Sequence, residues 1–599
     1  MRRFFLFLFF LNQLLALQFI HITDTHIGTA SGNKNLAAFV QLMQNFPQRP
    51  DFIVHTGDIT EFGSEEEFQA YSRLISSLNI PIYHTLGNHD VRWNGAGWLI
   101  GERYLANYKR NYVFTKEGIL FIALDSSFPF SQYGLIDPTQ LKWLRETLSK
   151  IPPQQPIIIF SHHPPLPSRN FLIGEEALFE ILRPYNVVLF LTGHGHSNLT
   201  WQREGINFLM TKGLMDENTN FRLIKIENNE IEISTIDLAG KEKENNKTRF
   251  PLRRIFTQVD ENPKNNKFPP IKKLSSSVQA DLLSYNDLIF ACDWDGEVVA
   301  IKGEGQDEIW RIKCDSPIIS SPAIDDGKLF VPFLNGYIRC YDCLTGKLLW
   351  ETNLPQPITG HLLVEKGKVF VPAYRRIFAL NERGEILWQR ELDGTLEARP
   401  LVRGNILYVG AWDKKLYAIN IESGDVIWQR ETARSRYFSP ATSSPIFWNN
   451  LLIITQPYDS STRRGGLLAL DEKGNTIWQI GGNFGYSTPV VKDDKLFIAS
   501  MEGKLICVST EGKILWSTNL SSPCFNSRPI IEKNRLYLVS FNDILYSVDI
   551  NDGKIMNKKV LSTDSCCVST PTILKEKLFI ADMMGNIYAV PLWEPSSNN

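Results

Sequence analysis

The sequence of 599 residues predicts two domains of different fold class, an α/β sandwich followed by an all-β propeller of eight blades. Up to about residue 240, short apolar runs typical of buried strands alternate with stretches of helical apolar spacing. From Trp310 onward, a tryptophan recurs about every forty residues, the period of a four-stranded blade. Histidine and cysteine divide in the same way: every histidine except His361 lies at or before His196, and every cysteine lies between Cys292 and Cys567. A chain of this length also exceeds what one hydrophobic core supports.

The bulk composition gives little sign of a charged macromolecular partner. The formal net charge is −2 at pH 7, and no long run of basic residues occurs. Domains that bind nucleic acid usually carry a basic patch, so we expect no nucleic acid as the main partner.

Residues 1–18 have a basic start and an apolar core that Asn12 and Gln13 interrupt. This stretch is short for a membrane span, so we predict a secretory signal peptide with cleavage near Ala16 to Gln18. The alternative is an uncleaved anchor. No cysteine follows the apolar run, so a lipoprotein anchor would have no attachment point. We therefore expect a secreted or periplasmic protein without a stable membrane span.

Export would permit disulfide bonds in the second half of the chain. The adjacent pair Cys566 and Cys567 and the close pair Cys340 and Cys343 are the candidates. Free buried thiols are the alternative, and the sequence does not decide between them.

The first domain is predicted over residues 19–240. Helical apolar spacing predicts helices at 35–44, 65–78 and 138–150. Ser64 and Glu67 form a capping box at the start of the second helix. Beyond His196, further strands are predicted at 207–210, 221–226 and 231–236.

Five apolar runs of this domain each end in a turn that carries metal-ligand residues. The turn Gly87-Asn-His-Asp90 brings an amide, an imidazole and a carboxylate together. The carboxyl ends of parallel strands meet at one edge of an α/β sheet, so these turns should form one site. The five segments are 19–26, 52–58, 80–90, 157–164 and 187–196.

The types and spacing of these residues predict a site for two metal ions. Asp24 and His26 are two residues apart, so strand alternation places both side chains on one side. His194 and His196 have the same spacing. Imidazoles, carboxylates and an amide oxygen suit Mn, Fe, Zn or Co better than Mg or Ca. Seven ligands exceed the needs of one ion and fit two ions that share a carboxylate.

In this order, the motifs Asp-x-His, Gly-Asp, Gly-Asn-His-Asp, His-x-Pro and Gly-His-x-His resemble the calcineurin-like metallophosphoesterase family over residues 19–238. The resemblance implies a metal-bridging hydroxide as nucleophile and His89 as the residue that protonates the leaving oxygen. It also implies the ligand sets: Asp24, His26 and His196 for the first metal, Asn88, His162 and His194 for the second, and Asp58 as the bridge.

The segment from Gly57 to Gly63, the Glu-rich helix after it and Arg92 resemble the subgroup of cyclic-nucleotide and glycerophosphodiester phosphodiesterases. The Gly-Asp-x-x-Asp-Arg pattern of protein phosphatases is absent from the sequence at 57–62, which disfavours a phosphoprotein substrate. Arg92 and His163 are the candidates for substrate binding, although His163 could instead support the ligands or only pack.

Other polar residues near the turns have simpler interpretations. Asp90 could orient its loop rather than contact a metal. His21, His55 and His84 lie inside predicted strands, so we expect satisfied core histidines.

Residues 241–270 are charged and then rich in proline and asparagine, which predicts an exposed linker. Within it, 250–256 is apolar enough to dock on a domain.

The propeller is predicted over residues 271–593, with blades beginning near 288, 329, 368, 406, 451, 495, 535 and 577. Its repeated tryptophans should lie between neighbouring blades. The long interval from Trp428 to Trp478 contains an apparent hairpin extension at 457–465. The last unit lacks a strand, which residues 268–276 could supply. A strand before Pro322, Pro400 or Pro489 would make the fourth of a blade.

The segments 340–350 and 418–428 resemble the quinoprotein-type (PQQ-like) repeat Ala-x-Asp-x-x-Thr-Gly-x-x-x-Trp. Some members of that family bind a quinone, and others scaffold assembly. The vicinal pair Cys566–Cys567 is similar to that of the quinone enzymes, but no cluster of calcium and quinone ligands accompanies it in the sequence, so PQQ is not expected. The default is a platform for a protein or glycan.

The sequence therefore predicts an exported, dinuclear-metal-dependent phosphohydrolase that acts on a phosphate ester, preferably a diester. The alternative is a propeller-based binding protein whose metal site is inactive or a secondary phosphomonoesterase.

Overall fold

The computed structural model describes residues 16–166, 172–243, 247–255, 268–303 and 307–593. Most of the predicted signal peptide lies outside these residues. The chain divides into two compact units, whose main boundary along the sequence falls between residues 262 and 263. In the described part of the chain, no helix has the length and apolar character needed to cross a membrane.

The first unit contains two six-stranded sheets. The first has the order β14-β13-β12-β1-β2-β3, with strands Thr248–Pro251, Glu230–Asp237, Asn220–Glu227, Leu17–Ile22, Phe52–Thr56 and Ile82–Thr85. The second has the order β10-β11-β9-β7-β5-β4, with strands Leu199–Arg203, Ile206–Met210, Val187–Thr192, Ile157–Phe160, Ile119–Leu124 and Asn111–Lys116. A short pair joins β6 (Gly134–Leu135) to β8 (Leu172–Ile173).

The centre of each sheet is parallel, as the continuous apolar runs predict. In the first sheet, β1 pairs with β2 and β2 with β3 in parallel, whereas β12, β13 and β14 add antiparallel strands at one side. In the second, β5, β7, β9 and β11 are parallel neighbours. Every residue of β5 and β9 is buried.

The hydrophobic core lies between these two sheets. Phe19 and Phe52 of the first sheet stack with ring centroids 4.9 Å apart. Phe121 of the second sheet meets both rings edge-on, at 5.5 and 5.2 Å. All three are fully buried, and each contributes about 1.5–3 kcal/mol by burial. The strand ends are thus fixed on a rigid base.

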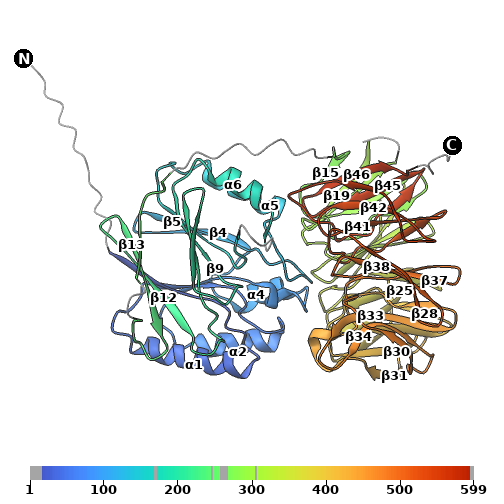
Figure 1. Ribbon diagram of the computed structural model, residues 1–599, viewed down its shortest axis with the longest axis horizontal. Helices are drawn as coiled ribbons and strands as arrows, with labels where there is room; N and C mark the ends of the chain where they lie inside the picture. The colour runs from blue at the N-terminus through green and yellow to red at the C-terminus, as the bar shows by residue number, and fades with distance from the viewer. Residues whose placement is uncertain (1–15, 167–171, 244–246, 256–267, 304–306, 594–599) are drawn as a thin grey trace, which may run out of the picture. The chain divides into compact units, whose positions relative to one another are not determined.

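Helices cover the two outer sides of the sandwich. Figure 1 shows α1 and α2 along one side and α5 and α6 along the other. The capping box of α2 is confirmed, because Ser64 and Glu67 exchange hydrogen bonds of 3.2 and 3.1 Å. The helices are α1 (Ala30–Gln44), α2 (Glu65–Ile75), α3 (Asn88–Val91), α4 (Gly97–Tyr104), α5 (Pro138–Leu148) and α6 (Glu175–Leu182).

Several element boundaries differ from the expectation, and α2 and α5 end at Ile75 and Leu148 rather than at residues 78 and 150. α1 begins at Ala30 rather than residue 35, because Thr29 caps it by accepting a hydrogen bond from the Gly32 N–H. β1 begins at Leu17, two residues before the expected domain start. Residues of the predicted linker form β14, and the buried Arg254 beyond it donates to the carbonyls of Leu182 and Glu204 at 2.7 Å.

The second unit is a propeller of eight four-stranded antiparallel sheets, as predicted. The first four blades are β16–β19 (Leu283–Tyr285, Leu288–Cys292, Glu297–Lys302, Glu308–Lys313), β20–β23 (Ala323–Asp325, Lys328–Pro332, Tyr337–Asp342, Leu348–Asn353), β24–β27 (Leu363–Glu365, Lys368–Ala373, Arg376–Asn381, Ile386–Glu391) and β28–β31 (Leu401–Arg403, Ile406–Gly410, Lys415–Asn420, Val426–Glu431). The next three are β32–β35 (Ile446–Trp448, Leu451–Asp459, Arg464–Leu470, Thr476–Ile480), β36–β39 (Val490–Lys492, Lys495–Ala499, Lys504–Ser509, Ile514–Asn519) and β40–β43 (Ile530–Glu532, Arg535–Val539, Ile544–Asp549, Ile555–Val560).

The last blade closes the ring with a strand from the other end of the domain. It consists of β44 (Thr572–Leu574), β45 (Lys577–Ala581), β46 (Asn586–Pro591) and β15 (Lys272–Lys273). Lys272 pairs with Ile587, so the predicted closure by residues 268–276 is confirmed. The hairpin extension is also present, since Asp459 pairs with Arg464 beyond the usual strand length.

The repeated tryptophans lie between blades, as predicted. The indole N–H of Trp388, for example, donates to the Ile421 carbonyl of the next blade at 2.8 Å. Gly424 of that blade has φ +71° and packs so closely that an added Cβ would lie 2.6 Å from the indole. Glycine in the turn therefore creates the seat for the ring. The same donation to the following blade is made by Trp310, Trp350, Trp428, Trp478 and Trp516.

The structure corrects the expected position of the short first strand in each blade. The short first strand of a blade follows the proline rather than preceding it, as with β20 after Pro322 and β28 after Pro400. Proline has no N–H for a sheet, so it suits the position just before a strand begins.

All eight cysteines are buried free thiols, and Cys567 Sγ donates to the Ala581 carbonyl at 3.3 Å.

Candidate metal centre

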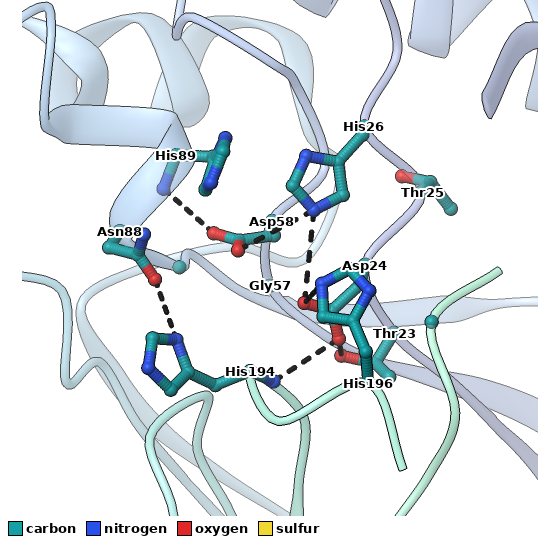
Figure 2. A network of polar contacts seen from close by, with 12 residues as sticks. Thr23, Asp24, Thr25, His26, Gly57, Asp58, Asn88, His89, His194 and His196 are labelled. Carbon is teal, nitrogen blue, oxygen red and sulfur yellow. Dashed lines mark hydrogen bonds and ion pairs between the residues drawn. The ribbon is translucent and has the colours of Figure 1, made fainter. Parts of the chain in front are cut away.

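The seven predicted ligands lie at the carboxyl ends of β1, β2, β3, β7 and β9. Figure 2 shows Asp24, His26, Asp58, Asn88, His194 and His196 together. Their backbone is unusual, since five of them adopt left-handed φ values between 45° and 67°: Asp24, His26, Asp58, His194 and His196. This conformation costs a residue with a side chain of order 1–3 kcal/mol and persists only where the surroundings impose it. Five of the seven candidate ligands thus carry backbone strain.

Interlocking loops impose that conformation. Asp24 N–H donates to the Gly57 carbonyl at 2.9 Å, and His26 N–H donates to the Asp58 carbonyl at 3.0 Å. The third loop approaches so closely that a Cβ on Gly87 would lie 2.2 Å from Asp58 Oδ1. Glycine at this position allows the loop after β3 to reach the loop after β2.

One ligand group consists of Asp24, His26 and His196. Asp24 Oδ1 lies 3.2 Å from His196 Nε2 and 3.9 Å from His26 Nε2. Asp24 Oδ1 and His26 Nε2 are both buried and have no hydrogen-bond partner. Buried polar atoms are normally satisfied, so this pair requires an explanation such as an ion. A metal ion suits a carboxylate oxygen and two imidazole nitrogens that converge in this way.

Two carboxylates that the sequence analysis missed orient the histidines of this group. His26 Nδ1 donates to Glu61 Oε2 at 2.7 Å, and His196 Nδ1 donates to Asp216 Oδ1 at 2.9 Å. Because an ionised carboxylate can only accept, the Nδ1 atoms carry protons, and each Nε2 faces the centre, where it would offer a lone pair to a metal ion. Partners of this kind are typical of metal-bound histidine.

The other ligand group consists of Asn88, His162 and His194. His162 Nδ1 donates to the Thr56 carbonyl at 2.7 Å, which directs Nε2 toward Asn88 Oδ1 at 3.2 Å. His194 Nδ1 lies 2.9 Å from the same amide oxygen. Neutral His162 would therefore place a lone pair against an oxygen acceptor. Either protonation of His162 or a cation between the groups would relieve that contact.

Asp58 lies between the two groups. Its Oδ2 is 3.3 Å from His162 Nε2 and 3.7 Å from His26 Nε2. Its Oδ1 accepts the backbone N–H of His89 at 2.8 Å, which holds the carboxylate in place. Asp58 thus occupies the position that a shared ligand requires.

The carboxylates set the protonation of the histidines around them. Burial disfavours the imidazolium of His26, but hydrogen bonds and charges from Asp24, Glu61 and Asp58 outweigh it and raise the pKa to about 10. The same balance raises the pKa of His196 to about 11 and that of His162 to about 9. Burial and the charge of His162 lower the pKa of His194 to about 3.

The two aspartates oppose this positive charge. Burial alone would raise the pKa of each, but His196 holds the pKa of Asp24 well below its usual range, and His162 and His89 lower that of Asp58. The centre therefore attracts cations strongly, and metal ions would replace imidazolium protons there.

His89, the candidate general acid, lies beside the first group. Its Nδ1 donates to the Glu61 carbonyl at 3.0 Å and lies 3.6 Å from Glu61 Oε2. Its ring centroid is 4.3 Å from that of His26. Because Nδ1 is engaged with Glu61, proton transfer to a leaving oxygen would use Nε2.

The two candidate substrate-binding residues differ in environment. His163 is fully buried, its Nδ1 lies 2.9 Å from Ser126 Oγ, and its Nε2 has no hydrogen-bond partner. Its ring centroid lies 4.6 Å from that of His194, so it belongs to the wall of the second group. Arg92 is half-buried and directly follows α3, where its N–H donates to the Asn88 carbonyl at 2.8 Å.

The remaining polar residues are structural. Asp90 accepts hydrogen bonds from the N–H groups of Thr60 and Gly87, both at 2.9 Å, and so orients its loop. The core histidines are buried and hydrogen-bonded, with His21 to Thr56 at 2.9 Å, His55 to Thr25 at 3.1 Å and His84 to Tyr71 at 3.0 Å.

Comparison with known proteins gives separate matches for the two units. Residues 17–198 match the family model of the calcineurin-like phosphoesterases. Residues 334–482 and 463–592 match that of the outer membrane protein assembly factor BamB.

Three curated relatives illustrate these matches. A probable glycerophosphodiester phosphodiesterase of Arcobacter nitrofigilis is 31% identical over 208 residues, which cover 31% of this chain and 74% of the relative. A 3',5'-cyclic-nucleotide phosphodiesterase of Nostoc is 29% identical over 244 residues, covering 36% and 90%. An outer membrane protein assembly factor BamB of Yersinia pestis is 21% identical over 355 residues, covering 54% and 89%.

Proposed function

The chain belongs to the calcineurin-like phosphoesterase family, and we propose that it is an exported phosphodiesterase that uses two metal ions. It is a metal-dependent phosphoric ester hydrolase by family, and it carries a PQQ-like propeller. The observation that supports the dinuclear proposal best is Asp58, whose Oδ2 lies within 3.7 Å of a histidine nitrogen from each group.

We propose that Asp24, His26 and His196 hold one ion, that Asn88, His162 and His194 hold the other, and that Asp58 contacts both. The donor set of imidazoles, carboxylates and one amide suits Mn, Fe, Zn or Co. When bound, the ions would supply charge neutralisation for phosphate oxygens and a hydroxide nucleophile at neutral pH.

The residues of the chain itself position the reaction and move the proton. Glu61 holds the ring of His26, and its Oε2 lies 3.6 Å from His89 Nδ1, on the side of the ring opposite the proton-donating Nε2. His89 would then donate a proton from Nε2 to the leaving alkoxide oxygen. Glu61 is a positioning residue in this scheme, because it acts through the two histidines.

A phosphodiester is the substrate class that the observations favour. Relatives named as glycerophosphodiester and cyclic-nucleotide phosphodiesterases match the catalytic unit. We propose that Arg92 and His163 bind the ester. Burial holds the pKa of His163 well below its usual range. His163 would therefore contribute a neutral N–H rather than a charge.

We further propose export to the periplasm or the outside of the cell, with the propeller as a platform for a protein or glycan. Cleavage after Ala16 would remove the basic and apolar start while leaving β1 intact from Leu17. Relatives of the propeller are named as outer membrane assembly factors.

The test is metal-dependent hydrolysis by the full chain of matched aryl phosphodiesters and phosphomonoesters. Asp24→Asn should abolish turnover, whereas the same change at the exposed Asp393 of the propeller, which pairs with Lys415, should leave it unchanged. Preference for the monoester would refute the diester assignment. Equal activity of both variants would refute the metal centre itself.

A further inference from the structure

Each blade of the propeller has an equivalent position two residues before its first, innermost strand, which gives eight positions in all. We call these positions the axial belt. First strands of neighbouring blades contact one another, for example β16 with β20 and β36 with β40, so the belt surrounds the propeller axis. Six positions hold aspartate, serine, threonine or histidine, and two hold arginine, Arg399 and Arg528.

Hydrogen bonds between neighbouring blades hold this belt together. The N–H of Asp281 donates to Ser321 Oγ at 3.0 Å, and the N–H of Ser321 donates to His361 Nδ1 at 2.7 Å. Across the ring closure, the N–H of Thr570 donates to Asp281 Oδ1 at 2.8 Å. Each side chain therefore serves as the acceptor for the blade before it.

The two arginines cannot serve as acceptors, because a guanidinium group has only donors. The N–H of His361 therefore donates to the Glu397 carbonyl at 3.0 Å rather than to the side chain of Arg399. Arginine at these positions therefore accepts no hydrogen bond from the preceding blade and introduces positive charge near the axis.

One of the two positive charges is compensated. Arg399 Nη2 lies 3.5 Å from Asp281 Oδ2, which joins two blades that are not neighbours in the ring. Both Asp281 oxygens are thereby engaged. Arg528 is exposed, and no hydrogen-bond acceptor within the described residues contacts its guanidinium. His361 adds no charge, since burial lowers its pKa to about 4.

Arg528 lines a cavity of about 450 Å³ whose wall includes β36 and β40. Lys492 and Lys533 also line it, and none of the described residues that line it is acidic. Lys492 Nζ donates to the Lys533 carbonyl, which holds it against the wall. Val490 and Ile530 supply an apolar part of the lining. The cavity thus combines cationic groups with aliphatic surface.

We propose that this cavity binds a small organic anion through a phosphate or carboxylate group. Arg528 provides a planar fork of N–H donors that matches either oxyanion in a bidentate manner. An apolar wall with a few convergent polar groups is the usual composition of a small-molecule site. The ligand's aliphatic part would pack on Val490 and Ile530.

Calorimetric titration of the full-length, metal-loaded protein with inorganic phosphate and with malonate tests the proposal. Arg528→Gln should weaken binding of the preferred anion by about 10–100-fold, the effect of losing a charged hydrogen bond. Arg383→Gln, which removes an exposed arginine from a turn of another blade, should bind as the unmodified protein does. Asp24→Asn should still bind the anion at the Arg528 cavity. This variant therefore distinguishes anion binding in the cavity from phosphate binding at the metal centre.

Thermal unfolding gives the second readout. In buffer without the anion, Arg528→Gln should not lower Tm, because the exposed guanidinium has no hydrogen-bond acceptor within the described residues. The anion should raise the Tm of the unmodified protein and of Arg383→Gln but not that of Arg528→Gln. The proposal fails if neither anion binds or if both arginine variants bind equally. It also fails if Arg528→Gln lowers Tm without the anion, since the arginine would then be structural.

Discussion

Glu61 connects a candidate metal ligand to the candidate general acid, so its replacement tests both roles. Its Oε2 accepts a hydrogen bond from His26 Nδ1 at 2.7 Å and lies 3.6 Å from His89 Nδ1, and the residue is only 6% exposed. Glu61→Gln keeps the shape and one acceptor oxygen but removes the negative charge.

The contacts set the size of the expected loss. A hydrogen bond to a charged group contributes about 1.5–3 kcal/mol and a neutral one about 0.5–1.5 kcal/mol. Loss of the charge beside His26 should therefore cost about 1–1.5 kcal/mol, or roughly tenfold in metal affinity. Turnover at saturating metal should fall by about another tenfold for esters with poor leaving groups, because His89 loses the carboxylate that orients its ring for proton transfer.

The assay measures metal titration and then turnover at saturating metal for a series of aryl diesters. Asp216→Asn is the matched control, because Asp216 bonds to His196 and its side chain is 22% exposed. Solvent screening should reduce that loss to about threefold in affinity, without a change in leaving-group dependence. Equal turnover of the two variants across all leaving groups would refute the link between Glu61 and His89.

Three further predictions follow from the same contacts. His89→Ala should retain the metals but lower turnover by about 10²–10⁴-fold, with a smaller loss for good leaving groups; a uniform loss would indicate positioning instead. Trp388→Ala should destabilise the propeller in urea by about 3–5 kcal/mol, because the indole is 9% exposed and bonded to the next blade; turnover per folded molecule should not change. In metal-free protein, His26 and His162 have raised pKa values of about 10 and 9. Their protonation contributes stability that is complete below about pH 6.5 and is lost as the pH rises through those two values. The Tm of the metal-free protein should therefore fall as the pH rises above about 6.5. A Tm that rises over this interval would contradict the charge balance of the centre.

Much of the fold and the convergence of the candidate ligands could be predicted from the sequence, because both depend on local signals. Apolar runs that end in Gly-Asp or Gly-Asn-His-Asp locate the strand ends, and parallel strands bring those ends to one edge. The Thr-Gly turn before Trp350 and the Ser-Gly turn before Trp428 indicate the blade register in the same way. Here the neighbours in the chain determine the structure.

The sequence analysis missed residues whose role depends on contacts distant in the chain. Glu61 reaches His26 across 35 residues, and Asp216 reaches His196 from a turn with no regular pattern. Glu61 could have been proposed as a partner of a metal-bound histidine, because it is a carboxylate that closely follows Gly57-Asp58. Asp216 lies in no recognisable motif. Likewise, β14 forms in the predicted linker because it pairs with β13. The linker was predicted from its charged residues, prolines and asparagines, and this composition does not indicate strand pairing.

The central claim is that Asp58 is shared by two metal ions, and elemental analysis of metal-reconstituted full-length protein tests it most directly. We expect two ions per chain in the unmodified protein and in Asp393→Ala. We expect Asp58→Ala to lose both, because the shared carboxylate offsets charge on each ion. Retention of both ions by Asp58→Ala would contradict the shared assignment.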